Sequence, residues 1–517
     1  GSRVLRRVLV ANRGEIAVRV IRTCRRLGIE TVLTVSDADA GSLPARLADR
    51  VIRIGPAAAS ASYLSVDAVV GAAVAAGADA VHPGYGFLSE NGRLARACAA
   101  AGIVFVGPAP ETLEATGDKL AARQHAIAAG LPVLPGGHVT PGADDGAGGA
   151  VPAAQVAGRI GYPVLVKAAG GGGGRGLRVV RGPAELEQAV TVASAEAEAA
   201  FGDPRVYLER YVERGRHVEV QLLGDGEHVI HLGDRDCSVQ RRYQKLIEEA
   251  PAPGLDDGLR ERLRAAAVEL GERLSYRGAG TVEFLVDADS AGISSGEFYF
   301  LEVNARVQVE HPVTEAVTGL DIVAEQLAIA EGRPLRLKQA DVTLAGHAIE
   351  VRVNAEDPDQ DFRPSPGTVT RAVFPATTLP AATLPAATLP AATPAPARTA
   401  SPAVAARGVR VDTHVQAGAT VPPYYDSLLA KVIAHGADRD DARAALRGAL
   451  DRCVIDGVTT NLGLQRALLA DAEFAAGGVD TGYLPRWLAR GPEGNGAGDE
   501  EAATVRNHLG PGDGADG

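Results

Sequence analysis

The sequence predicts an α/β protein of about three domains, and two observations carry that prediction. The chain has 517 residues, and domains of roughly 150 residues each would make about three. The N-terminal region alternates short apolar runs with segments of helical periodicity, which is typical of a parallel sheet covered by helices. In the central part, strand patterns follow one another directly, so we expect an α+β arrangement there.

The N-terminal elements follow from apolar spacing. Strands are predicted at 8–11, 31–35 and 103–107, and helices at 15–27 and 66–76. Ile16, Val20, Cys24 and Leu27 share one face of the first helix. The order is Rossmann-like, but Asn-Arg-Gly-Glu rather than a GxGxxG turn follows the first strand. A bound dinucleotide is therefore not expected.

The region from about 111 to 344 opens with helix patterns and a Gly/Pro-rich loop at 141–152. Its strands are predicted at 163–169, 177–181, 206–211, 217–223, 228–233, 280–287 and 297–308. Two helices are predicted, one at 183–200 and one whose apolar face contains Leu259, Leu263, Ala267, Leu270 and Leu274.

A third region, about 345–489, begins with an alternating strand at 347–354. Prolines at 375, 380, 385 and 390 then repeat every five residues within Ala, Thr and Leu. We expect this stretch to be an extended or flexible insertion. The Gly-rich acidic tail at 491–517 is expected to be disordered.

Composition excludes several classes of protein. The chain has 52 Lys and Arg against 64 Asp and Glu, a net charge of −12, and no long basic block. This charge disfavours a nucleic-acid-binding protein. There is no run of 18 apolar residues and no apolar N-terminal signal, so we expect neither a membrane span nor secretion. Four widely spaced cysteines indicate a reducing cytoplasm.

A glycine run between two predicted strands is the first candidate site. Gly170–Gly174 follow Lys167, which lies in an apolar strand. Consecutive backbone N–H groups without Cβ atoms can close over phosphates, and a Lys adds a point charge. The alternative is a flexible linker or a tight hairpin. A P-loop is excluded, because no GK[ST] follows.

Two acidic residues inside apolar strands form the second candidate. Glu283 and Glu302 would face one another in a hairpin, and like charges at such a distance need a cation between them. Alternation places Glu302, Asn304 and Arg306 on one face. Hard oxygen ligands favour Mg²⁺, which commonly accompanies the phosphates of a nucleotide. The alternative is a half-buried strand with a solvated polar face.

The third candidate is the polar run of Arg306, Gln308, Glu310 and His311, with Arg352 on a later strand. Arginines beside carboxylates suit an anionic substrate, although a structural ion-pair network is an equal alternative. Two further segments are weak in isolation. The basic cluster at 240–245, followed by the acids at 248–249, is typical of a solvated surface. The segment 82–87 is typical of a turn.

Ten segments in order closely resemble the biotin carboxylase family of ATP-grasp enzymes. They include GYPVLVKAAGGGGGRGLRVV at 161–180 and EFYFLEVNARVQVEHPVTE at 297–315. The others lie at 8–23, 82–91, 117–123, 216–221, 235–253, 278–284, 350–358 and 422–432.

The resemblance implies a division of the chain. It implies a Rossmann-like N-terminal domain at 1–112 and an ATP-grasp domain at 113–345 whose mobile lid covers about 131–211. A mixed α/β C-terminal domain at 346–490 would carry the insertion at 375–406, and the disordered acidic tail would follow at 491–517.

The resemblance also implies a reaction. ATP and bicarbonate give carboxyphosphate and ADP, and the carboxyl group passes to N1′ of biotin. The implied nucleotide-binding residues are Lys119, Lys167, Gly173, Gly174, Glu209, Arg210, Tyr211, Val212, His217, Gln240 and Tyr243. Tyr243 stands where many family members carry a His. Glu283, Glu302 and Asn304 would hold Mg²⁺ or Mn²⁺.

The implied bicarbonate site comprises Lys245, Arg306, Gln308 and the Val309 N–H, with Glu310 as the base. Arg352 would stabilise the enolate-like oxygen of biotin, and Tyr85 and Asp426 would lie beside it. A bicarbonate ion needs such a base and orienting cations because it is a weak nucleophile.

Expected partners are a separate biotin carboxyl carrier protein and the carboxyltransferase component of an acetyl-CoA or other acyl-CoA carboxylase, because no biotinylation motif is visible. A homodimer is also expected, and the insertion could alter it. Two alternatives remain: an ATP-grasp ligase for another carboxylate, and a non-catalytic nucleotide-binding subunit.

Overall fold

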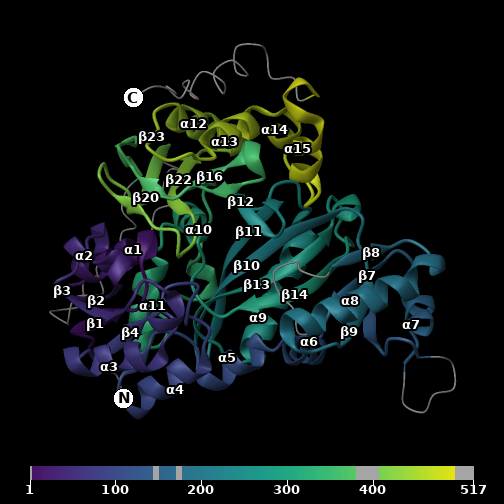
Figure 1. The fold of residues 1–517 in the computed structure, drawn as a ribbon, viewed down its shortest axis with the longest axis horizontal. Helices are drawn as coiled ribbons and strands as arrows, with labels where there is room; N and C mark the ends of the chain where they lie inside the picture. The colour runs from purple at the N-terminus through teal and green to yellow at the C-terminus, as the bar shows by residue number, and fades with distance from the viewer. Residues whose placement is uncertain (1–2, 144–150, 170–176, 380–406, 495–517) are drawn as a thin grey trace, which may run out of the picture.

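The computed structural model describes residues 3–143, 151–169, 177–379 and 407–494. Its N-terminal part is a parallel five-stranded sheet in the order β3-β2-β1-β4-β5, coloured purple to blue in Figure 1. The strands are β1 (Arg7–Val10), β2 (Glu30–Ser36), β3 (Arg50–Gly55), β4 (Ala80–His82) and β5 (Val104–Phe105). The helices are α1 (Gly14–Arg26), α2 (Leu43–Leu47), α3 (Val66–Ala76) and α4 (Gly92–Ala100). The predicted parallel α/β sheet is confirmed.

A smaller lobe lies at the right of Figure 1. It is an antiparallel sheet in the order β6-β9-β7-β8. Its strands are β6 (Gly136–Val139), β7 (Val164–Ala168), β8 (Arg178–Val180) and β9 (Val206–Arg210). Two helices, α7 (Ala153–Ile160) and α8 (Leu186–Phe201), pack on it through a separate apolar core that includes Val156, Val190 and Leu208. The glycine run at 170–174 lies outside the described residues.

The centre of the molecule is one antiparallel sheet of eight strands in the order β14-β13-β10-β11-β12-β15-β22-β20. Its strands are β10 (Gly215–Asp225), β11 (Val229–Arg241), β12 (Gln244–Ala250), β13 (Arg277–Asp287), β14 (Phe298–Asn304), β15 (His347–Asn354), β20 (Gly408–Thr413) and β22 (Leu428–Gly436). The pairing of β12 with β15 joins the central and third regions of the sequence in a single sheet.

Helices from several parts of the chain cover this sheet. They are α5 (Pro110–Gly117), α6 (Lys119–Ala128), α9 (Asp257–Arg273), α10 (His311–Thr318), α11 (Ile322–Ala330), α12 (Arg439–Asp451), α13 (Leu462–Ala470), α14 (Ala472–Ala476) and α15 (Tyr483–Gly494). Short strands complete the C-terminal part: β16 (Glu356–Asp357), β17 (Arg363–Pro364), β18 (Gly367–Thr368), β19 (Arg371–Val373), β21 (Thr420–Val421) and β23 (Val454–Asp456). None of the helices in the described part combines the length and apolar composition that crossing a bilayer requires.

Four sequence predictions differ from the structure. The strand expected at 228–233 continues to Arg241, because Asp234, Arg235 and Asp236 are buried in ion pairs instead of ending it. The segment 244–250, where no strand is predicted, forms strand β12. The strand expected at 297–308 ends at Asn304, so Arg306 lies beyond it. Residues 491–494, expected in the tail, belong to α15.

Glu249 on β12 connects two elements of the C-terminal part. Its carboxylate shares a 2.6 Å hydrogen bond with His347 Nε2 on β15 and accepts from Arg439 Nε, at 2.7 Å, at the start of α12. Burial favours the neutral acid, but His347 and Arg439 outweigh it and lower the pKa of Glu249 to about 2. This depressed pKa stabilises the fold above the unfolded-state pKa, and that stability is lost as the pH falls toward 2.

We expect Glu249→Gln to lower the free energy of unfolding by about 3 kcal/mol at pH 7, since each pKa unit corresponds to about 1.4 kcal/mol. Urea unfolding at several pH values measures this. The difference in the free energy of unfolding between the variant and the wild type should become smaller as the pH falls below about 4.5. Glu227→Gln, at an exposed position, is the control. An equal difference in the free energy of unfolding at pH 7 and pH 3 would show that the charge of Glu249 does not stabilise the fold.

Candidate functional site

A cavity of about 1380 Å³ lies between the four-stranded lobe and the eight-stranded sheet. Strands β7 and β9 line one side, and β10 to β15 line the other. Every residue that the family resemblance assigns to the site lines this cavity, except Gly173 and Gly174, which lie outside the described residues. The structure thus brings together residues between 85 and 426 that are far apart along the chain.

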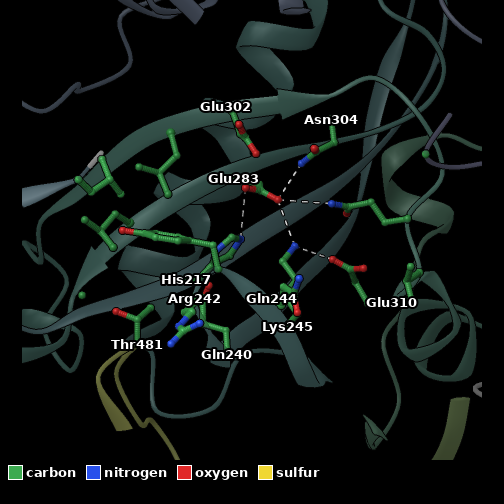
Figure 2. Close-up of a pocket in the computed structure, with 18 of the residues that line it drawn as sticks. His217, Gln240, Arg242, Gln244, Lys245, Glu283, Glu302, Asn304, Glu310 and Thr481 are labelled. Atoms are coloured by element: carbon green, nitrogen blue, oxygen red, sulfur yellow. Dashed lines mark hydrogen bonds and ion pairs between the residues drawn. The ribbon is translucent and has the colours of Figure 1, made fainter. Parts of the chain in front are cut away.

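Lys245 is the centre of the cavity's charge cluster (Figure 2). Its Nζ lies 3.0 Å from Glu219 Oε2, 3.1 Å from Glu283 Oε1 and 2.7 Å from Glu310 Oε1. Burial opposes the charged ammonium, but these carboxylates outweigh it and raise the pKa of Lys245 well above its usual value. Lys245 is thus the cation that these three carboxylates share.

Glu283 and Glu302 face one another, as the sequence predicts. They are direct partners in the register of β13 and β14. The Asn304 amide donates to Glu283 Oε1 at 2.7 Å. Burial, together with the charge of Glu283, raises the pKa of Glu302 to about 7. A carboxylate pair that resists double ionisation in this way is suited to a divalent cation.

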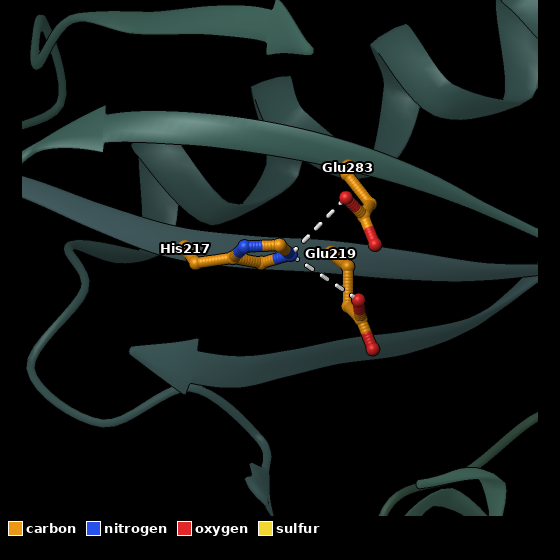
Figure 3. A group of neighbouring side chains, drawn as sticks. All are labelled: His217, Glu219 and Glu283. Carbon is orange, nitrogen blue, oxygen red and sulfur yellow. Dashed lines mark ion pairs between the residues drawn. The ribbon is translucent and has the colours of Figure 1, made fainter. Parts of the chain in front are cut away.

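His217 extends this acidic group (Figure 3). Its Nε2 lies 3.5 Å from both Glu219 Oε2 and Glu283 Oε2, and ligand atoms of the three residues lie within 4.8 Å of one another. Burial disfavours the imidazolium, but Glu283 outweighs it and raises the pKa of His217 to about 9. His217 thus lies between two carboxylates that favour its protonated form.

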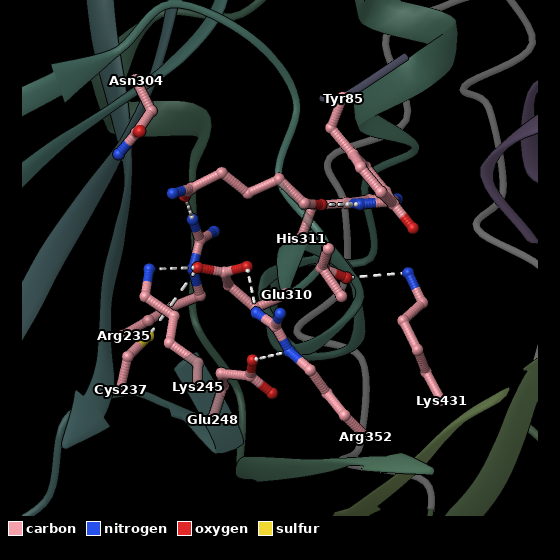
Figure 4. Close-up of polar contacts among 12 residues, drawn as sticks. Tyr85, Arg235, Cys237, Lys245, Glu248, Asn304, Glu310, His311, Arg352 and Lys431 are labelled. Atoms are coloured by element: carbon pink, nitrogen blue, oxygen red, sulfur yellow. Dashed lines mark hydrogen bonds and ion pairs between the residues drawn. The ribbon is translucent and has the colours of Figure 1, made fainter. Parts of the chain in front are cut away.

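Glu310 lies between two cations (Figure 4). Besides Lys245, it accepts a hydrogen bond from Arg352 Nη2 at 3.1 Å on Oε2. Arg352 also donates through Nε to Glu248. Burial raises the pKa of Glu310, but Lys245 and Arg352 outweigh it and lower the pKa below its usual range. Glu310 is 2% exposed, and the two cations favour its charged form, which is the form that can accept a proton.

Two lysines line the cavity from different elements. Lys167 on β7 pairs with Glu209 on β9 at 3.0 Å. Lys119 occupies the first turn of α6, where the Asp118 carboxylate caps the backbone N–H groups of Leu120 and Ala121. Lysine side chains at a cavity wall and a helix N-terminus are suited to phosphate oxygens.

The hairpin between β11 and β12 carries the cluster expected to be solvated. Arg242 and Tyr243 adopt positive φ values of 47° and 66° at its tip, and Tyr243 is 62% exposed at the cavity. That prediction is wrong for Gln240 and for Glu248 and Glu249, which are buried. The turn expected at 82–87 is confirmed by Gly84 and Gly86, with φ of 62° and 65°.

Sequence reasoning missed two fully buried residues, Glu219 and Arg235. Arg235 donates to Glu219 Oε1 at 2.7 Å and to Gln308 Oε1 at 2.6 Å. The signal was present: His217, Glu219 and Gln221 alternate within an apolar strand, in the way that singled out Glu283.

Comparisons with known proteins agree with this geometry. A model of the biotin carboxylase N-terminal domain matches residues 4–113, and one of the biotin carboxylase C-terminal domain matches 394–486. Between them, a model of the carbamoyl-phosphate synthase L chain ATP-binding domain matches 115–338. All three parts of the chain are therefore matched.

Similar whole proteins include biotin carboxylases and a component of a related enzyme. The chain is 47% identical to a biotin carboxylase of Pseudomonas aeruginosa, covering 94% of this chain and 99% of that protein. It is 44% identical to a pyruvate carboxylase subunit from Methanothermobacter thermautotrophicus, covering 93% and 90%. A solved biotin carboxylase structure from Campylobacter jejuni superimposes with a TM-score of 0.80 at 42% identity, covering 93% and 99%.

The biotin carboxylase domain of a Hydrogenobacter thermophilus 2-oxoglutarate carboxylase, solved with MgADP, ADP and bicarbonate, gives a TM-score of 0.80 at 40% identity, covering 94% and 98%. Near-complete coverage by such relatives, and a cavity lined by the residues that the family's motifs carry, lead to one conclusion: this chain belongs to the biotin carboxylase family of ATP-grasp ligases.

Proposed function

We propose that this chain performs the first half-reaction of an acetyl-CoA or other acyl-CoA carboxylase. ATP and bicarbonate give carboxyphosphate and ADP, and the carboxyl group then passes to biotin on a separate carrier protein. The observation that carries the proposal is the buried Glu310 carboxylate held between Lys245 and Arg352. Such an arrangement provides a base and two cations for a small anion at one point.

In the proposed mechanism, Glu310 removes the proton of bicarbonate. Lys245, Arg306, Gln308 and the Val309 N–H hold the anion. Arg235 supports this assignment, because its hydrogen bond orients Gln308. Arg352 then stabilises negative charge on the biotin ureido oxygen, with Tyr85 and Asp426 as neighbours. The Tyr85 phenol is fixed by a hydrogen bond to Glu15.

We propose that the nucleotide lies between the two sheets. Its phosphates would contact Lys119, Lys167 and the glycine run with Gly173 and Gly174. The base and ribose would contact residues 209–212, His217, Gln240 and Tyr243. Glu283, Glu302 and Asn304 fit Mg²⁺ by their donor set, and the bound ion would neutralise phosphate charge. The 2-oxoglutarate carboxylase domain, solved with MgADP and bicarbonate, supports these ligands.

Partners follow from the same proposal. The acceptor of the carboxyl group is chosen by a carboxyltransferase, which for this chain we propose to be the acyl-CoA type. We also propose a homodimer, as described for the 2-oxoglutarate carboxylase domain, and a cytoplasmic location. The domain limits at 112, 345 and 490, and a lid at about 131–211, belong to this proposal. Light scattering tests the dimer, and reconstitution with candidate carriers tests the acceptor.

The decisive experiment measures ADP release by the purified chain with Mg²⁺ and bicarbonate, with and without free biotin. Stimulation by biotin that also requires bicarbonate is the expected result. If ATP binds and the protein is folded but biotin gives no stimulation, the same assay with biotinylated carrier separates dependence on a carrier from a different ATP-grasp substrate. No response to either form of biotin would refute the proposal.

Glu302→Gln should raise the Mg²⁺ concentration for half-maximal activity by at least about tenfold, since it replaces a charged oxygen ligand by a neutral one. A titration of ADP release with Mg²⁺ measures this. Glu297→Gln, at an exposed position next to the same strand, is the matched control. An unchanged Mg²⁺ requirement in Glu302→Gln would remove this residue from the metal site.

A further inference from the structure

Lys431 lies on β22 and is fully buried, and it is not part of the cavity lining. Its Nζ donates a 2.7 Å hydrogen bond to the carbonyl oxygen of Val309 (Figure 4). Val309 stands between Gln308 and Glu310, the two residues to which we assign bicarbonate and the base. A side chain from the C-terminal part of the molecule thus reaches the backbone of the proposed bicarbonate site.

A buried ammonium is costly unless it is paired, and Lys431 is paired. Its Nζ lies 3.1 Å from Glu15 Oε1 on α1 and 3.9 Å from Asp412 Oδ2 on β20. Ala430 and Val432, on either side of Lys431 in the strand, are fully buried apolar residues. These two side chains point to the other face of the sheet, and the cross-strand partners of Lys431 are Arg352 and Asp412. The ammonium therefore balances buried carboxylates and, in addition, makes a directional bond to Val309.

Glu15 connects this ammonium with Tyr85, a residue of the cavity wall. The Glu15 oxygen that faces Lys431 also accepts the hydrogen bond of the Tyr85 phenol. Tyr85 and Asp426 both line the cavity, and together with Glu15 they also line a smaller adjoining pocket. Tyr85, Glu15, Lys431 and Val309 therefore form one chain of contacts from the proposed biotin side to the proposed bicarbonate side.

We propose that Lys431 is a positioning residue: it fixes the Gln308–Glu310 backbone against α1 and β22, so that the base and the bicarbonate contacts keep their geometry. The inference rests on the proposed function, which assigns bicarbonate to this segment. Displacement of a reacting group by about 1 Å can cost about 100-fold in rate.

The test uses Lys431→Met in the full chain, with Lys338→Met at an exposed position as the matched control. We expect kcat/KM for bicarbonate to fall 10- to 100-fold and the Kd for MgATP to stay unchanged. Amide hydrogen exchange at 305–311 should be at least tenfold faster, and exchange in β7 and β9 unchanged. Lys338→Met should match the wild type in all three measurements.

A second variant, Lys431→Met with Glu15→Gln, separates positioning from charge compensation. The second change removes the Glu15 carboxylate, which loses its cation in Lys431→Met. Asp412 keeps its 2.8 Å contact to Arg410. Stability should recover and kcat/KM for bicarbonate should not. Recovery of kcat/KM would overturn the inference, as would wild-type exchange at 305–311 in both variants. Exchange does not depend on turnover, so a wild type without biotin-stimulated ADP release would refute the proposed function alone.

Discussion

Glu310→Gln is expected to lower biotin-dependent ADP release by about 10²- to 10⁴-fold, the usual contribution of a general base. The amide keeps the shape of the carboxylate but cannot take a proton from bicarbonate. The Kd for MgATP should be unchanged, because the residues proposed to bind the nucleotide lie on other elements. Steady-state ADP release and equilibrium ATP binding, measured on the same preparation, give both quantities.

The variant should remain folded because neither cation is stranded. Lys245 keeps Glu219 and Glu283, and Arg352 keeps Glu248. Glu272→Gln, on an exposed face of α9, controls for the loss of a carboxylate elsewhere. Turnover within about twofold of wild type would remove Glu310 from the role of base. Loss of ATP binding together with turnover would instead indicate a wider structural role.

Local periodicity predicted elements whose apolar residues recur at the regular spacing of a helix or a strand. Helix α3 occupies 66–76 and strand β15 occupies 347–354, as predicted. Strand β11 shows the limit of this reasoning. Its charged residues at 234–236 indicate a strand end when only the sequence is considered. They remain in the strand because partners such as Glu219 and Arg260 come from other elements, and no local pattern reveals those pairings.

In the candidate site, too, local sequence predicted some contacts and not others. The facing of Glu283 and Glu302 could be predicted, because a hairpin and strand alternation suffice to bring them together. The central place of Lys245 could not. It depends on the order of strands in the eight-stranded sheet, which places β12 beside β11 and β15. Nor did the spacing of residues indicate that a lysine at 431 would reach Val309.

Lys245→Met should have the largest effect on stability. It leaves three buried carboxylates without their shared cation, and breaking a buried ion pair from one side typically costs about 3–5 kcal/mol. The three are not affected equally. Glu219 retains Arg235, and Glu310 retains Arg352. Among the residues that the structure describes, the cation left to Glu283 is His217, at 3.5 Å against 2.7 Å for Arg235–Glu219 and 3.1 Å for Arg352–Glu310. The largest share of the loss should therefore come from Glu283.

This asymmetry gives a test that a general loss of packing would not pass. Adding Glu283→Gln to Lys245→Met should restore more than half of the lost free energy of unfolding in urea, because the stranded charge is gone. Adding Glu219→Gln instead should restore none, since it strands Arg235. Lys338→Met should have no effect. All variants that lack Lys245 should be inactive in ADP release, because the proposed bicarbonate contact is missing. Equal rescue by both second changes would show that Lys245 compensates the cluster's net charge rather than Glu283.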